Sequence, residues 1–567
     1  MPFNSYGFIF IFLPLTLTGF HLLYRLGGRT AALGGLTLAS VVFYGYAGLG
    51  NILLVLPWVF LNYLIATASI DLRLSRPLVR QALFVGGVSI NVLVLGYFKY
   101  RNFFADTVNQ LAGTHFQWVT LILPLGVSFM TFQNIGFLAD VYARRIEAVR
   151  LPDFLLFTLF FPRAAAGPIV RYTEFVPQLV NTSRGSANDV CVAICLFSVG
   201  LFKKSIVADG IAQYVPGTFD NPLSLSSLTL LTAWTGVLSY TFELYFDFSG
   251  YSDMALGVAR LFGLKLPMNF NSPYKSCSII EFWSRWHISL TRFLTAYVYT
   301  PIVLHLARAR MLVGKPVLSG RRSALSAVLV LVGCPTLITM TVSGLWHGAG
   351  WQFVVWGILH GLYLTINQTW RLFRTRFWRH SPSYHRVMRP LGVMLTFGAV
   401  VVAFVFFRAS SVSDGMSILR AMAGSNGLFP HDVQMYRHLG VEIGWTMMTG
   451  YWQPVAPVIW IVTLLVSVMV LPNTLELLQR YQPAVDFPDA LDAQSSASSG
   501  AVAGEHREVS ERARIWPGWV GHTWKAAGEI GRSGILLSRA TATAAAFLFV
   551  LALTALNHGT RFLYWKF

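Results

Sequence analysis

TVSGLWHGAGWQFVVWGILHG, residues 341–361, is apolar enough to lie within a membrane, yet it contains two histidines. His347 stands between Trp346 and Gly348, and His360 follows about one apolar helix later. An ionisable side chain in such a segment is functional by default. Imidazole can accept and return a proton near neutral pH, and the surrounding glycines leave room for a substrate. The stretch therefore indicates a general base inside a membrane-embedded site.

The same residues also match a structural alternative. Trp346, His347 and Trp351 are typical of an aromatic belt at the end of a helix, where amphipathic rings meet the lipid headgroups. This segment by itself leaves both interpretations open.

The composition excludes an ordinary water-soluble domain. Of 567 residues, 54% are hydrophobic and 12% are charged, which is typical of a multi-pass membrane protein. The formal net charge of +19 comes from basic residues in short loops between apolar stretches, a pattern of cytoplasmic loops and not of a nucleic-acid-binding face. The four cysteines are too few and too scattered for a disulfide framework or a zinc site. We expect no metal and no nucleic-acid partner.

Apolar stretches long enough to cross a hydrocarbon core of about 30 Å recur along the chain. They lie at 7–24, 31–48, 50–68, 81–98, 117–141, 324–345, 351–370, 390–407, 456–477 and 534–556, with further helices at 188–212 and 226–263. The first stretch lacks a basic leader and a cleavage site, and so predicts a retained helix. The fold class is therefore an all-α polytopic integral membrane protein.

The basic clusters predict the topology. Those expected on the cytoplasmic side are at 144–150, 308–322 and 371–389, which places the N-terminus outside. Residues 481–531 are rich in Ala, Ser, Glu and Arg without a hydrophobic period, and predict a disordered cytoplasmic insert. The insert separates a membrane core at 1–480 from a final helix and outer aromatic tail at 532–567.

Residues 154–172 are interrupted and do not match a simple membrane span. Pro162, Gly167 and Pro168 break residues 154–172, which favours a re-entrant segment, because irregular backbone at membrane depth must be buried in protein or line a cavity. Arg163 lies within this segment. One interpretation is that it binds an anionic group; the other is that its side chain extends to the membrane surface or pairs with a group of the protein.

Residues 264–292 mix Pro, Asn, Lys, Glu and Arg with two tryptophans, which predicts an amphipathic or re-entrant piece at the membrane surface. Here Arg285 and Arg292 flank His287, and could receive a phosphate-bearing donor. A surface-lying helix with Trp and Arg among the headgroups is the alternative.

Glu243 and Asp247 lie four residues apart and share a helix face. They are candidates for a proton relay, but in a chain rich in arginine the neutralisation of buried cations is favoured.

Six stretches together resemble the membrane-bound O-acyltransferase (MBOAT) family, in particular its bacterial polysaccharide branch. They are LPLGVSFMTFQNIGFLADVY (123–142), FFPRAAAGPIVRY (160–172), SYTFELYFDFSGYSDMALGVARLFG (239–263), NFNSPYKSCSIIEFWSRWHISL (269–290), SGLWHGAGWQFVVWGILHG (343–361) and TRFLYWKF (560–567). The six stretches occur in the same order as in the family, which makes the resemblance specific. The small residues before Gly167 and the insert depart from the family pattern, and leave subfamily and partner open.

The resemblance implies an MBOAT-like bundle of about 11–13 transmembrane helices, with re-entrant or interfacial helices around a central cavity. It implies that His347, in the WHG motif, is catalytic, and that His287, in the RWHISL motif, is a second functional position. It also implies a multi-pass protein of the bacterial inner membrane that passes an acyl group from a cytoplasmic donor, such as acetyl-CoA or another acyl carrier, toward an exopolysaccharide of alginate or cellulose type.

Partners implied by the resemblance are a periplasmic or membrane-anchored polysaccharide acetyltransferase and a polysaccharide synthase complex, besides the lipid bilayer. No tightly bound cofactor is expected. Candidate donor contacts are Arg285, Arg292 and Arg163. Candidate hydrogen-bond donors toward the cavity are Trp346, Asn269, Asn271 and Tyr274, although turn formation before Pro273 is the favoured role of the two asparagines. D-alanyl transfer to teichoic acid and a non-enzymatic polysaccharide or ion transporter are the competing functions.

The predicted topology can be tested at the insert. A cysteine introduced by Gly500→Cys should resist a membrane-impermeant maleimide applied from the periplasmic side, because a cytoplasmic insert is inaccessible to the reagent. Labelling of this position above the level of the four natural cysteines would contradict the topology. Deletion of the insert should leave polymer acetylation intact, since a segment without apolar residues to bury has little to order it.

Overall fold

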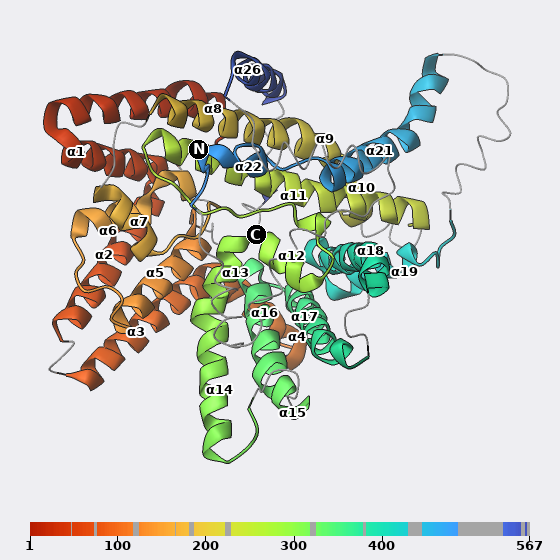
Figure 1. Cartoon of the computed structure of the whole chain (residues 1–567), viewed down its shortest axis with the longest axis horizontal. Coiled ribbons are helices and arrows are strands. Elements are labelled where there is room, and N and C mark those ends of the chain that lie inside the picture. The colour runs from red at the N-terminus through yellow and green to blue at the C-terminus, as the bar shows by residue number, and fades with distance from the viewer. Residues whose placement is uncertain are drawn as a thin grey trace.

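The computed structural model is built of helices (Figure 1). It describes residues 1–567 except 47, 73–75, 117–123, 165, 181–185, 221–227, 318–324, 378–381, 429–444, 486–536, 557–561 and 564–567. The α-helices are α1 (Leu13–Gly45), α2 (Leu49–Asp71), α3 (Pro77–Leu95), α4 (Arg101–Ala112), α5 (Val127–Tyr142), α6 (Leu151–Leu159), α7 (Tyr172–Val180), α8 (Ala187–Phe202), α9 (Asp209–Ala212), α10 (Pro216–Phe219), α11 (Leu230–Leu261), α12 (Ile279–Arg285), α13 (Ile288–Leu294), α14 (Thr300–Leu312), α15 (Leu325–Val328), α16 (Cys334–His347), α17 (Trp351–Phe377), α18 (Pro382–Arg408), α19 (Val412–Met422), α21 (Trp445–Val470), α22 (Thr474–Leu477) and α26 (Arg539–Thr554). Short π or 3₁₀ turns include η2 (Gly96–Tyr100), η3 (Phe161–Arg163), η4 (Lys203–Ala208) and η9 (Leu329–Gly333).

The described residues contain six helical stretches that are long and apolar enough to cross a membrane. This is fewer than the 11–13 helices implied by the resemblance. Two apolar helices, Ala456–Val470 and Arg539–Thr554, fall short of the required length, and the stretch Gly7–Gly45 contains two predicted spans in one. Part of the predicted span at 117–141 lies outside the described residues, and its helix begins at Val127.

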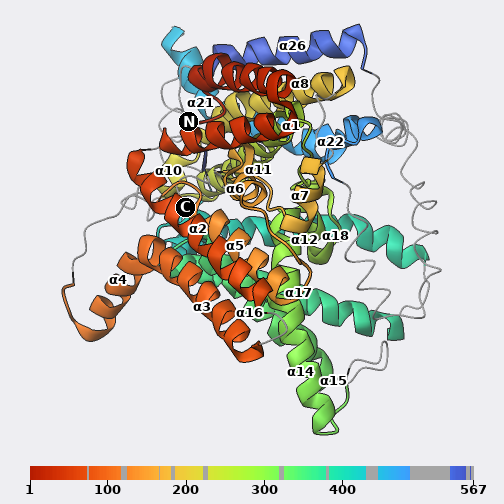
Figure 2. The ribbon, with the colours of Figure 1, turned by 90° about the vertical axis from the view of Figure 1, so that its left-hand side faces the viewer.

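Helix α1 folds back on itself at Gly28 (Figures 1 and 2). Gly28 has φ 71° and ψ −167°, a conformation open essentially to glycine. The two arms pack so closely that a Cβ at Gly35 would lie 2.3 Å from Cδ1 of Leu23. The two predicted spans at 7–24 and 31–48 are therefore the two arms of this hairpin.

Helix α11 is the central element, because most of its side chains are buried on every face. It crosses α8 at backbone contact: a Cβ at Gly200 would lie 2.6 Å from the carbonyl oxygen of Gly250, and one at Gly257 would lie 2.6 Å from that of Ala193. Small residues allow such an approach, and hence close packing of apolar helices.

Buried ion pairs join α11 to the turn η4 that continues α8. Lys204 Nζ lies 2.6 Å from Asp247 Oδ1, and Lys203 Nζ lies 2.7 Å from Asp253 Oδ2. The backbone N–H of Leu563 donates to the second oxygen of Asp247 at 3.0 Å, which fastens the end of the chain to the core. The favoured interpretation, that the acids of α11 neutralise buried cations, is confirmed for Asp247.

Much of the segment 264–292, predicted to be an amphipathic or re-entrant piece, is buried within the protein. Phe282 and Trp286 are buried, and His287 is fully buried, because the chain from Gly263 returns across α11 and breaks into the short helices α12 and α13. The interrupted segment near Pro162 is buried as well, with η3 between α6 and an extended stretch. Residues 481–485, assigned above to the insert, are packed: Arg260 donates to the carbonyls of Tyr481 and Gln482.

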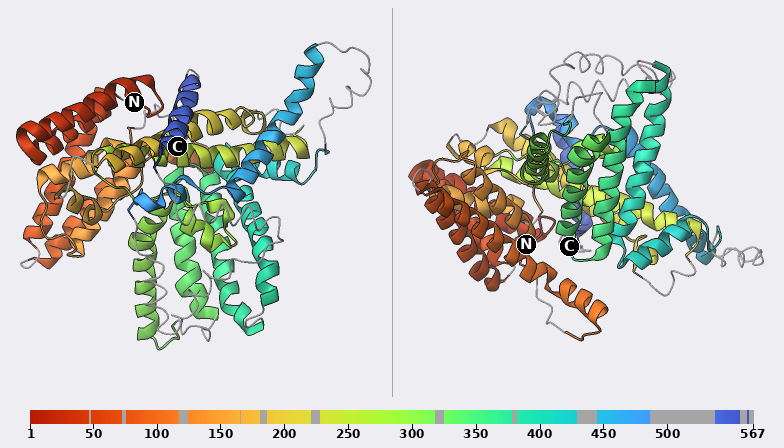
Figure 3. Two further views of the ribbon diagram at one scale, coloured as in Figure 1. Left: turned by 45° about the horizontal axis from the view of Figure 1, so that its top comes forward. Right: turned by 90° about the horizontal axis from the view of Figure 1, so that it is seen from below.

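Helices α14, α16, α17 and α18 lie on one side of α11 (Figures 1 and 3). Within this group α16 and α17 form a hairpin whose backbones touch. A Cβ at Gly344 would lie 2.2 Å from the carbonyl oxygen of Phe353, and one at Gly357 would lie 2.4 Å from that of Met340. A Cβ at Gly348 would meet the Phe353 ring at 2.0 Å. The expectation that these glycines leave room for a substrate is therefore wrong, because protein atoms fill the space.

We expect Gly357→Ala to destabilise the protein, because the new methyl group would collide with backbone that cannot rotate away. Overpacking of this kind typically costs about 1–3 kcal/mol. The matched control is Gly398→Ala on α18, where no atom lies within 4 Å of the added Cβ. The apparent melting temperature of the detergent-purified protein should fall for Gly357→Ala and stay or rise for Gly398→Ala. Equal melting temperatures for both variants would contradict the backbone contact.

Candidate active site

His347 is the last residue of α16, and its side chain is enclosed by aromatic rings. Its ring centroid lies 5.2 Å from that of Trp356 and 5.1 Å from that of Phe407, both in edge-on contact. Trp346 packs against it from the preceding position, at 4.9 Å. Only 3% of His347 is exposed. His347 therefore lies within a packed aromatic shell.

His287 lies at the break between α12 and α13. Its backbone has φ 43° and ψ 52°, a left-handed conformation that is uncommon for a residue with a side chain and is often found at functional sites. The imidazole meets the Phe248 ring of α11 at 4.7 Å and 89°. Burial lowers the pKa of His287 to about 3, so that its imidazole is neutral. The two imidazole centroids are 6.5 Å apart, and the structure thus brings both predicted histidines together.

The loop before α12 supports the His287 backbone. The N–H of Ile288 donates to the Asn269 carbonyl at 2.9 Å. Without this bond, the break between α12 and α13 would leave that N–H with no hydrogen-bond partner. The Asn269 side chain accepts from Ser289 Oγ at 2.6 Å and donates to Ser252 Oγ at 3.2 Å, and so joins α13 to α11. Asn269 therefore acts as a support in this structure.

The other three candidate cavity residues also form hydrogen bonds within the protein. Tyr274 donates its hydroxyl to the Thr241 carbonyl at 2.7 Å, and Asn271 accepts from the Asn473 side chain at 3.0 Å. Trp346 donates its indole N–H to the Ser128 carbonyl of α5 at 3.1 Å. These bonds orient the walls of the site around the histidines.

His360 belongs to the same aromatic cluster, but it has a specific structural partner. Its Nδ1 accepts from the indole N–H of Trp283 at 3.3 Å, which ties α17 to α12. The imidazole also packs against the ring of Trp356 at 4.9 Å, and the residue is fully buried. His360 is thus a bridge between helices.

The three predicted donor arginines do not converge. Arg285 Nη2 pairs with Glu281 at 2.8 Å, and Arg292 Nη2 pairs with Glu174 at 2.5 Å. Arg163 is buried, with its guanidinium over the rings of two phenylalanines of α6 and α7, at 4.8 and 5.4 Å. Of the three, only Arg292 lines the pocket described next.

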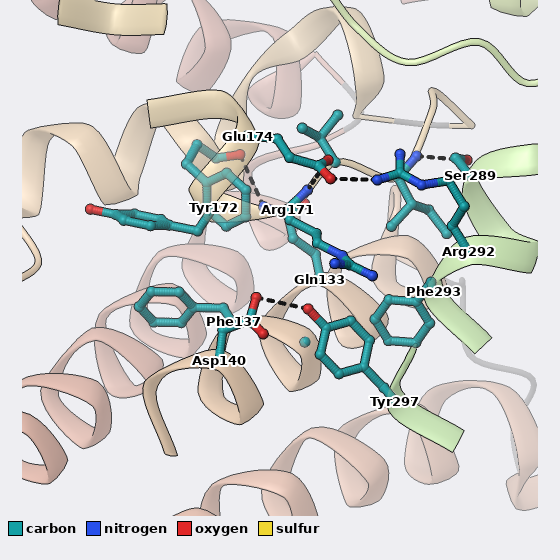
Figure 4. A pocket seen from close by; sticks show the side chains of 14 residues that line it. Gln133, Phe137, Asp140, Arg171, Tyr172, Glu174, Ser289, Arg292, Phe293 and Tyr297 are labelled. Carbon is teal, nitrogen blue, oxygen red and sulfur yellow. Dashed lines mark hydrogen bonds and ion pairs between the residues drawn. The ribbon is translucent and has the colours of Figure 1, made fainter. Parts of the chain in front are cut away.

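A small open pocket lies between α5, α7 and α13 (Figure 4). Its polar lining includes Arg171, Arg292 and Tyr297, and the hydroxyl of Tyr297 donates to Asp140 at 2.8 Å. The Arg171 guanidinium lies over the Tyr297 ring at 5.4 Å. Sequence reasoning missed Arg171, although it stands eight residues after Arg163 in the same motif-bearing stretch. Only the fold shows that it faces Arg292 across a pocket.

An aromatic row leads from this pocket to His347. The Phe293 ring, which lines the pocket, stacks on Phe132 at 4.7 Å, and Phe132 stacks on Trp346 at 5.0 Å. Trp346 directly precedes His347. The pocket and the histidines are therefore adjoining parts of one region.

Comparison with known proteins agrees with this arrangement. The model of the MBOAT, membrane-bound O-acyltransferase family matches residues 138–313, which include His287 and the pocket-lining arginines. A peptidoglycan O-acetyltransferase of Helicobacter pylori is 34% identical over 456 residues, or 75% of this chain and 80% of the relative.

A probable alginate O-acetylase of Pseudomonas aeruginosa is 34% identical over 460 residues, or 80% of each chain. A teichoic acid D-alanyltransferase of Streptococcus thermophilus is 30% identical over 298 residues, which cover 51% of this chain and 69% of the relative. Identity of this extent, together with an all-helical membrane fold and two buried histidines side by side, shows that the chain belongs to the membrane-bound O-acyltransferase family and is an acyltransferase.

Proposed function

We propose that this protein transfers acetyl groups for O-acetylation of a polysaccharide outside the cytoplasm of a bacterium, from its place in the inner membrane. The observation that carries the proposal is the pair of buried imidazoles 6.5 Å apart in an aromatic shell. Acyl transfer to a hydroxyl needs a base for the hydroxyl proton and a site without competing water. The two imidazoles are the candidate bases, and the tryptophan and phenylalanine rings around them exclude water.

In this proposal His347 is the general base. Its imidazole accepts the proton of the acceptor hydroxyl while the hydroxyl oxygen forms a bond to the acyl carbon. The bond from that carbon to the donor then breaks, and the proton passes to the leaving group. His287 supplies a second hydrogen-bonding imidazole at the reacting groups. An environment without water strengthens such hydrogen bonds.

The donor is proposed to be a cytoplasmic, phosphate-bearing acyl carrier such as acetyl-CoA. Two features support an approach through the pocket of Figure 4. Arg171 and Arg292 line it, and guanidinium groups suit phosphate. Arg145 pairs with Asp140 of the pocket at 2.8 Å, so the pocket adjoins the basic loop predicted to be cytoplasmic. An acyl group entering there would meet the aromatic row that ends at His347.

The acceptor is proposed to be a cell-envelope or secreted polysaccharide of alginate, cellulose or peptidoglycan type. Support comes from the relatives named for alginate and peptidoglycan O-acetylation, of which the chain covers four fifths. A periplasmic acetyltransferase and a polysaccharide synthase are the proposed partners. D-alanyl transfer is the second candidate, favoured by the similarity to the teichoic acid D-alanyltransferase, and a carrier-protein gene beside this one would identify it. The pairing of Asp247 with Lys204 argues against an ion relay through α11.

We expect His347→Gln to lower polymer acetylation by about 10²-fold or more, because general-base catalysis contributes on that order. The measurement is the ester-linked acetate of the polysaccharide, normalised to folded protein in the membrane. His360→Gln is the matched control, since both histidines are buried imidazoles of one aromatic cluster. It should reduce the melting temperature by weakening the bond to Trp283, while the folded fraction keeps its activity. Normal acetylation by His347→Gln would reject the base assignment.

We expect Arg171→Gln to raise the KM for acetyl-CoA by about tenfold, because a hydrogen bond to a charged group contributes about 1.5–3 kcal/mol. Arg292→Gln should also raise this KM. It is the less specific variant, because it removes the ion-pair partner of Glu174 as well. Arg285→Gln, outside the pocket, is the control and should leave this KM unchanged. Acetyl-CoA titration in membrane vesicles distinguishes them. An unchanged KM in Arg171→Gln would exclude the pocket as the donor site.

A further inference from the structure

The carbonyl groups of the last turn of α16 are all hydrogen-bonded, although the helix ends inside the protein. The last four carbonyls of an α-helix have no partner within it, and in an apolar interior each needs another donor. The N–H of Gly348 donates to the Gly344 carbonyl at 3.3 Å. The next three carbonyls, which end with that of His347, accept from side chains of η2, located 245–248 residues earlier in the chain.

Lys99 makes two of these three bonds. Its Nζ donates to the carbonyl of Trp346 at 2.6 Å and to that of His347 at 2.9 Å. The hydroxyl of Tyr100 donates to the Leu345 carbonyl. Both side chains come from a π-helical stretch of five residues between α3 and α4. Such widened turns occur frequently at functional sites, because they redirect side chains out of the regular helical pattern.

The charge of Lys99 is directed at the end of α16. Lysine in an apolar segment is costly and is usually kept for a function, and Lys99 lies half-buried in the stretch Pro77–Ala112. In the described part of the chain its ammonium forms no ion pair with a carboxylate. It faces instead the negative end of the α16 dipole, where a cation is stabilising.

We propose that Lys99 is the positioning residue of His347. By holding the carbonyl of His347 itself, the ammonium fixes the backbone from which the imidazole projects. By holding the carbonyl of Trp346, it fixes the ring that packs against that imidazole. The inference rests on the proposed function of His347 as the base. A displacement of about 1 Å at a reacting group can reduce the rate by about 10²-fold, so a lysine that touches no substrate can still control the reaction.

The test uses the full-length protein in its own membrane, with acetate esters of the polysaccharide measured per folded protein. Lys99→Met keeps the length of the side chain and removes its donors, and Lys99→Arg keeps the donors. The matched control is Lys275→Met, because Lys275 Nζ donates to the Leu471 carbonyl just after α21, at 2.7 Å, and so also caps a helix end. Should Lys99→Met fail to fold, Lys99→Gln, which retains one donor group, takes its place.

We expect Lys99→Met to lose at least tenfold of its activity, Lys99→Arg to recover most of that loss, and Lys275→Met to keep the specific activity of the native protein. Rescue by arginine would not occur if side-chain packing alone mattered. Specific activity in Lys99→Met within twofold of native, in an assay where His347→Gln is inactive, would overturn the inference. So would equal losses in Lys99→Met and Lys275→Met.

A second readout is independent of the reaction. In the purified protein, diethylpyrocarbonate should modify the enclosed His347 slowly, and Lys99→Met should accelerate that modification several-fold without changing the rate at His360, as followed by peptide mass spectrometry. An unchanged rate at His347 would overturn the positioning role. If the rate rises but His347→Gln is fully active, the positioning role stands and the proposed base function fails, so the two failures are distinguishable.

Discussion

The need to satisfy backbone groups where helices break inside an apolar protein governs this structure. In water a frayed helix end is solvated, but in a membrane core every open carbonyl or N–H needs a partner from the chain itself. Both histidines stand at such breaks: His347 ends α16, and His287 separates α12 from α13. Breaking a helix frees its terminal residue from the regular helical pattern, which allows an imidazole to be aimed at a chosen point.

Each break is supported by a segment far away in sequence. Lys99 and Tyr100 hold the end of α16, and the backbone carbonyl of Asn269 holds the start of α13. Close glycine contacts between α16 and α17 complete the arrangement, since they bring the two backbones together. The supports of the site are thus hydrogen bonds to backbone and contacts between backbones. Neither depends on flexible side-chain packing alone.

Buried charged groups also have partners from the protein itself. Lys203 and Lys204 meet the carboxylates of α11, and Arg292 meets Glu174 beside the pocket. Because each of these cations has an acid within hydrogen-bonding distance, the interior tolerates them. Arg171 and Lys99 are placed differently: one faces an aromatic ring at a pocket, and the other faces carbonyl oxygens at the end of a helix. These two departures from simple pairing lie at the proposed donor site and at the histidine site, whereas Arg163 lies over phenylalanine rings outside the pocket.

The sequence by itself determined the class of the molecule, since its apolar stretches and basic loops permit only a helical membrane protein. The motifs around His347 and His287 also pointed to two histidines, which the structure places side by side. Only the tertiary structure decided how they meet. Residues 264–292 look amphipathic in sequence and prove to be buried, because local composition does not reveal that α11 and its neighbours surround them. The glycines near His347 serve helix contact and not substrate space, and Lys99 belongs to the site although it lies 248 residues before it. Such relations are set by the packing of distant helices, and no pattern within one helix contains them.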